Sequence, residues 1–192
     1  KCLKRILLAV HTECKREEDG KKFLEVFFSF LGKDKNDERI SFILLESAEM
    51  IRFSMLEDSE IDRLLEFAEH CTKWTSEEES IRVLQFIRSM VQSGVPKERV
   101  RPYAVRILGK TGKNTIALKY IGYKLCMETD IEVPDREETE KLLFENEGLF
   151  SQIFLENMKV ATSRMIKKAN IELLSDITKL GDPMHISRIA IH

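Results

Sequence analysis

Glycine and proline are scarce in this sequence, with 8 glycines and 4 prolines among 192 residues. Long stretches therefore run without a helix-breaking residue, which argues against a β fold with many turns. Hydrophobic residues make up 43% of the chain and charged residues 33%. This balance is typical of an ordered, helix-rich protein and argues against a disordered one. We therefore expect one all-α domain over residues 1–192.

Long hydrophobic runs are also missing. The apolar residues 6–10 have charged neighbours on both sides, and they are too few for a membrane span or for the core of a signal peptide. The sequence begins with Lys1 and not with an initiator methionine. We therefore expect it to be a piece of a larger protein.

No two cysteines have the close spacing of metal ligands. The four cysteines lie far apart, at Cys2, Cys14, Cys71 and Cys126. This favours reduced thiols on buried helix faces, in a cytoplasmic or nuclear protein. His11 shares a helix face with Cys14, but two ligands do not make a zinc site. The sequence predicts no metal and no cofactor.

Catalytic signatures are absent from the sequence as well. It contains no dinucleotide-binding glycine motif, Walker-type loop, His-Glu-x-x-His or nucleophile elbow. Residues 109–113, Gly-Lys-Thr-Gly-Lys, lack the preceding strand and the spacing of a phosphate-binding loop, and we interpret them as a turn between helices. We expect a chain that is not an enzyme; an accessory domain of an enzyme is a compatible alternative.

Apolar residues recur at intervals of three and four, which is the period of amphipathic helices. Breakers and caps divide this pattern into about nine or ten helices. We expect them over residues 1–16, 23–31, 40–55, 59–68, 76–94, 101–109, 114–125 and 135–144. Residues 149–180 contain no glycine or proline and predict either one long helix or two with an unmarked junction, with an apolar stripe that includes Ile153, Phe154, Met158 and Met165. The expected core includes Ile43, Leu64, Leu84, Ala104, Leu108, Ile121 and Leu143.

Local signals place several helix starts. Ser59 is a good N-cap, and Ser76 with Glu79 has the spacing of a capping box. Pro102 suits the first turn of a helix, so the sixth helix begins near Arg101, or else a short turn at residues 97–100 leads into a kinked helix.

The rest of the chain is organised around residues 95–125, which predict two packed helices joined by a glycine turn. The pairs Val100-Arg101, Ala104-Val105 and Leu108-Gly109 resemble the pattern of HEAT and armadillo repeats, over about one repeat. This resemblance implies a right-handed α-solenoid of antiparallel helix pairs. The expected helices pair into units of roughly 35–40 residues, the period of such repeats. An irregular helical bundle explains the same breakers and is the alternative.

Positive charge is concentrated in the middle of the chain. Residues 88–124 contain nine basic residues and one acidic residue, a net +8 in a chain whose net charge is -2. Residues 57–79 and 128–147 each carry -7. The basic stretch therefore either attracts an external polyanion or neutralises acidic helices beside it.

Two functions of different classes follow from this charge pattern. The first is a non-catalytic scaffold segment that binds a protein partner, for example an acidic segment of it, within a larger assembly. The alternative is a nucleic-acid-contacting helical module. In both, the candidate partner-binding residues are Arg99, Arg101, Arg106, Lys110, Lys113 and Lys119.

Overall fold

The computed structural model describes residues 17–31, 45, 51, 53–73, 76–111, 115–160 and 162–180. Every regular element within these residues is helical, so the expected all-α fold is confirmed for this part of the chain. The helices are α2 (Glu17–Leu31), α4 (Asp58–Cys71), α5 (Glu77–Gln92), α6 (Lys97–Lys110), α7 (Ile116–Thr129), α8 (Arg136–Glu140), α9 (Glu147–Met158) and α10 (Arg164–Leu180). Phe53–Met55 forms a short 3-10 turn, and Lys141–Glu145 continues α8 as a π-helical turn. None of the described helices is long and apolar enough to span a membrane.

Two predicted helices fall largely outside the described residues. The helix expected over residues 1–16 lies there, and so does most of the one expected over 40–55, including Ile43. Helix α2 begins at Glu17, whereas we expected this helix to begin at Phe23. The one glycine in this stretch, Gly20, lowers helix propensity but does not end the helix.

The predicted capping signals are correct in one of two cases. The Ser76 hydroxyl accepts a hydrogen bond from the Glu79 backbone N–H (3.2 Å), as the capping box at the start of α5 requires. Ser59 is not the N-cap of α4. That helix begins at Asp58, and the Glu60 carboxylate accepts from the Glu57 backbone N–H (2.9 Å).

Helix α6 starts at Lys97, directly after Pro96, so a start near Arg101 is wrong. Pro102 lies inside the helix on its exposed side. Its missing N–H and the carbonyl that it leaves unpaired therefore face water, which makes the proline tolerable.

Residues 149–180 form two helices, α9 and α10, and polar caps mark their junction where glycine and proline are missing. The Thr162 hydroxyl donates to the Glu156 carbonyl at the end of α9 (2.8 Å). The Ser163 hydroxyl accepts from the Ile166 N–H in the first turn of α10 (3.2 Å). This junction shifts the phase of the apolar pattern, so Ile153 and Met165 are buried while Phe154 and Met158, expected on the same stripe, are exposed.

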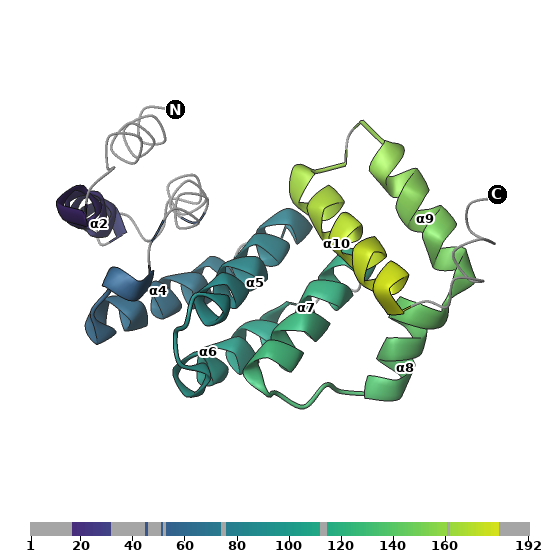
Figure 1. Cartoon of the computed structure of the whole chain (residues 1–192), viewed down its shortest axis with the longest axis horizontal. Coiled ribbons are helices and arrows are strands. Elements are labelled where there is room, and N and C mark those ends of the chain that lie inside the picture. Colours follow the sequence, from purple (N-terminus) through teal and green to yellow (C-terminus); the bar gives the residue numbers. More distant parts are fainter. Residues whose placement is uncertain are drawn as a thin grey trace.

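Helix α5 lies at the centre of the packing (Figure 1), where it contacts α4, α6, α7 and α10. Helix α4 also packs against α6, and α7 also packs against α6 and α10. Of the expected core residues, Leu64, Leu84, Ala104, Ile121 and Leu143 are completely buried. Leu108 is only partly buried and lies over Gly122 of α7.

The difference in burial between Leu84 and Leu108 predicts a difference in stability. Leu84→Ala should lower the free energy of unfolding by about 2–5 kcal/mol, because it leaves a cavity in a fully packed site. Leu108→Ala should cost about 1–2 kcal/mol, since water already reaches part of that side chain. Urea unfolding followed by circular dichroism measures both values, and equal losses would contradict the packing described.

Candidate functional site

The predicted basic residues of α6 lie against the acidic helix α4. Arg99 Nε donates to Asp62 Oδ1 and its Nη2 to Asp62 Oδ2, both at 2.9 Å, and the same guanidinium pairs with Asp58. The hydrogen bond from Arg99 holds the pKa of Asp62 below its usual value. Arg99 therefore already has two carboxylate partners within the chain.

Glu69 of α4 receives two of the other candidate residues. Its Oε2 accepts from Arg106 Nε (2.9 Å) and its Oε1 from Lys110 Nζ (2.8 Å). The hydrogen bond from Lys110 is the main cause of the lowered pKa of Glu69; burial opposes it, and Arg106 adds to it. The Arg106 guanidinium also lies over the Tyr103 ring, 4.4 Å from its centroid.

The remaining candidate residues lie elsewhere. Arg101 Nε donates to the Thr129 carbonyl at the end of α7 (3.0 Å), and the guanidinium lies 3.7 Å from Asp130. Lys119, on α7, is partly buried and forms no ion pair with any described residue. Lys113 lies outside the described residues. The structure therefore places Arg99, Arg106 and Lys110 along α4, and it separates Arg101 from them.

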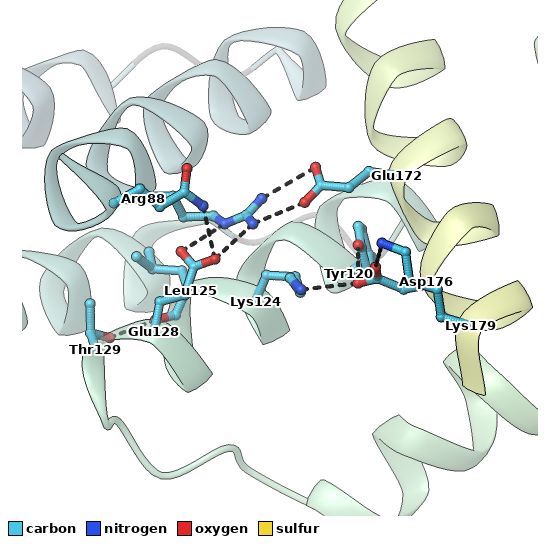
Figure 2. A network of polar contacts seen from close by, with 10 residues as sticks. Arg88, Tyr120, Lys124, Leu125, Glu128, Thr129, Glu172, Asp176 and Lys179 are labelled. Atoms are coloured by element: carbon cyan, nitrogen blue, oxygen red, sulfur yellow. Dashed lines mark hydrogen bonds and ion pairs between the residues drawn. The ribbon is translucent and has the colours of Figure 1, made fainter.

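A second charged cluster, which we call the Arg88 network, connects α5, α7 and α10 (Figure 2). Arg88 is 5% exposed, and its guanidinium donates to two carboxylates. Nε and Nη2 reach Glu128 of α7 at 3.0 and 2.9 Å, and Nη2 and Nη1 reach Glu172 of α10 at 2.9 and 3.4 Å. Burial opposes the positive charge, but the hydrogen bonds to the two glutamates outweigh it and raise the pKa of Arg88.

Asp176 of α10 forms the other half of the network. Its Oδ2 accepts from the Tyr120 hydroxyl (2.8 Å) and from Lys124 Nζ (2.9 Å), both on α7. Burial opposes ionisation of Asp176, but the hydrogen bonds from Lys124 and Tyr120 prevail and lower its pKa. Burial, together with the hydrogen bond to Asp176, raises the pKa of Tyr120. At neutral pH this carboxyl is ionised and this phenol protonated, so neither group is poised near neutrality for proton transfer.

The sequence contained one signal for this network that our interpretation did not use. We counted Arg88 only as one charge of the basic stretch. Its spacing from Ile81 and Leu84 is seven and four, which places an arginine on the buried stripe of α5. A charged residue at a core position requires a buried partner. The identities of Glu128 and Glu172 could not follow from local spacing, because they lie 40 and 84 residues away.

Exposed apolar side chains gather on α9 and the turn after it. Phe154 is 62% exposed, Leu155 63%, Met158 68% and Val160 100%. The opposite side of α9 carries the buried Leu149 and Ile153, so the exposed residues face away from the core. We call Phe154, Leu155, Met158 and Val160 the α9 apolar surface.

Metal ligands and reactive thiols do not gather in the part of the chain that the structure describes. No group of three or more His, Cys, Asp or Glu side chains there could hold a metal ion. Cys71 and Cys126 are free and buried, as expected, while Cys2 and Cys14 lie outside the described residues. Burial raises the pKa of the Cys71 thiol to about 12, so little reactive thiolate forms at neutral pH.

Comparisons of the chain with protein-family models, with curated proteins and with solved structures found no match.

Removing Arg88 should destabilise the protein because two partly buried carboxylates lose their counter-charge. Arg88→Met should lower the free energy of unfolding by about 2–4 kcal/mol, toward the lower end of buried ion pairs, since Glu128 and Glu172 are partly exposed. Adding Glu128→Gln and Glu172→Gln should restore part of the loss. Arg101→Met, on a half-exposed arginine, should cost less than about 1 kcal/mol. Chemical denaturation measures each variant, and a wild-type value for Arg88→Met would exclude a structural role for the network.

Stability should fall in acid because Asp62, Glu69 and Asp176 have lowered pKa values in the folded protein. The stability that these ionised carboxylates contribute is fully present above about pH 4, the pKa of an unfolded carboxyl. It is lost as the pH falls through their lower pKa values in the folded protein. Asp176→Asn should therefore destabilise the protein at neutral pH and approach the wild type in acid. Urea titrations across this range provide the test; a stability difference independent of pH would contradict the role given to Asp176.

Proposed function

We propose that this chain is a non-catalytic helical scaffold segment that binds a protein partner within a larger assembly. The α9 apolar surface carries this proposal, because its four exposed apolar side chains all lie on one short helix and the turn that follows it. Exposing such side chains to water is unfavourable, and contiguous exposed apolar patches mark sites of protein interaction. Aromatic residues and methionine, here Phe154 and Met158, are enriched in protein interfaces relative to the rest of the surface.

The basic residues of α5, α6 and α7 mostly pair with carboxylates of neighbouring helices, and this structural role agrees with a scaffold. Arg99, Arg106 and Lys110 connect α6 to α4, and Arg88 and Lys124 connect α5 and α7 to α10. A nucleic acid would have to compete with these carboxylates for the basic residues, and its phosphates would meet the acidic groups directly. The nucleic-acid alternative is for this reason the weaker proposal.

We also retain a HEAT-like arrangement as a proposal for α4 to α7. Helix α4 packs against α5 and α6 against α7, while the corresponding helices of the two pairs, α4 with α6 and α5 with α7, are also in contact. Stacked repeats produce this set of contacts. Helix α10 departs from it, since it contacts both α7 and α5, whereas a repeat contacts only its neighbours. The C-terminal part thus favours the bundle alternative.

Site-specific photo-crosslinking tests the scaffold proposal. A photoreactive residue at Leu155 should give discrete adducts with a protein partner in the cells that naturally produce this protein. The same residue at Val105, an equally apolar position that is 51% exposed on α6, provides the matched control. Adding Phe154→Ser and Met158→Ser should abolish the adducts at position 155. Adducts of equal yield at both positions, or none at 155, would refute the proposal.

The basic residues of α6 should contribute to stability more than to binding. Arg106→Glu with Lys110→Glu places three negative side chains together at Glu69 and should lower the free energy of unfolding by roughly 1–2 kcal/mol. Adducts at position 155 should be unchanged. Titration with nucleic acid at two salt concentrations completes the test: tight, salt-sensitive binding by the wild type that the double variant lacks would favour the nucleic-acid alternative.

A further inference from the structure

A second basic segment borders the α9 apolar surface. Residues 157–171 contain four basic residues and no acidic one, a net +4 in a chain of net charge -2. The four are Lys159, Arg164, Lys167 and Lys168. The segment covers the end of α9, the turn and the first half of α10, so its positive charge is continuous with the apolar surface along the chain.

These cations differ from those of α6 in having few partners. Lys159 pairs with Glu156 of its own helix (2.7 Å). Within the described residues, Arg164, Lys167 and Lys168 form no ion pair. Unlike Arg99, Arg106 and Lys110 of α6, these three have no carboxylate partner among the described residues.

Helix geometry places two of these cations, Arg164 and Lys168, together with a further apolar residue. Arg164, Lys168 and Ile171 follow one another at spacings of four and three, and all three are exposed, Ile171 by 60%. The buried residues Met165, Ala169 and Leu173 occupy the other side of α10. The outer side of α10 therefore presents Ile171 beside positive charge, and the α9 apolar surface directly precedes this helix along the chain.

We propose that the α9 apolar surface and the adjoining cations Arg164, Lys167 and Lys168 form a docking site for an acidic amphipathic segment of a partner protein. This inference rests on the proposed scaffold function and adds the chemistry of the partner. Apolar side chains of the segment cover Phe154, Leu155 and Met158, and its carboxylates lie along the start of α10. The charge pairs at the edge of such a contact favour the correct partner and speed association more than they add affinity.

Charge complementarity selects this occupant over two others. A second copy in a symmetric dimer would bring the same positive segment against itself, which costs energy. An anionic membrane surface would attract the basic segment, but the membrane would repel the rest of the molecule, whose net charge is -6. A short acidic segment reaches the cations without approaching the other acidic helices.

Selection from a displayed library of random peptides tests the chemistry of the partner. The wild-type protein should enrich peptides that combine acidic residues with large apolar ones. The enriched peptides should bind about tenfold more weakly to Phe154→Ser with Met158→Ser, and also to Arg164→Glu with Lys168→Glu. Arg106→Glu with Lys110→Glu, a charge reversal of equal size on α6, should leave their binding unchanged.

Each other outcome overturns a defined part of the proposal. Enriched peptides that are neutral or basic, yet need Phe154 and Met158, would refute the acidic partner and leave the scaffold function intact. If the wild type enriched peptides no better than the Phe154→Ser, Met158→Ser variant, the docking site would be refuted. The crosslinking at Leu155 decides the scaffold function separately. Binding to phosphatidylcholine vesicles only when they contain phosphatidylserine, without peptide enrichment, would assign the surface to membranes instead.

Discussion

A guanidinium group that is removed from water must keep its counter-charges, and this constraint on Arg88 fixes three helices relative to one another. Glu128 of α7 and Glu172 of α10 each accept two hydrogen bonds from it. The planar donor geometry of arginine allows only a narrow range of positions for these two partners. Apolar packing of α5, α7 and α10 can slide at small cost, whereas a misplaced carboxylate leaves a buried charge unpaired. We infer that the network favours the arrangement in which both carboxylates reach Arg88.

Opposite charges far apart in the sequence meet because the helices that carry them are neighbours. The excess of acidic residues on α4 and of basic residues on α6 cancels across their interface, with Glu69 shared between Arg106 and Lys110. Charge counts along a sequence therefore do not show which charges are available for binding. The longest basic stretch is largely engaged within the fold, while three cations of the shorter segment around α10 have no carboxylate partner in the part of the chain that the structure describes.

The sequence predicted the features that depend on near neighbours. The capping box of Ser76 and the buried stripe of Leu118, Ile121 and Leu125 are found as expected, because hydrogen bonds and helix period act over a few residues. The junction between α9 and α10 was not located, since hydroxyl caps such as that of Ser163 are much weaker sequence signals than glycine or proline.

Missing that junction had a direct effect on the candidate site. A single apolar period across it assigns Phe154 and Met158 to the core, and the exposed surface they form is then hidden. The partners of Arg88 and of the α6 cations depend on tertiary contacts, which cannot be read from the spacing of residues in a single sequence. The positions of charged residues could be read, but not their pairing.

The separations along the chain between paired residues also bear on how the domain folds. The ion pairs of α6 with α4 close loops of 37 to 41 residues, whereas the pair of Arg88 with Glu172 spans 84. Closing the longer loop costs more chain entropy, and non-local contacts of this kind slow folding. We infer that α4 to α7 assemble first and that α10 docks afterwards onto a surface already formed. Helix α10 would then be the first to detach in partial unfolding, and α4 to α7 would remain as a smaller cooperative unit.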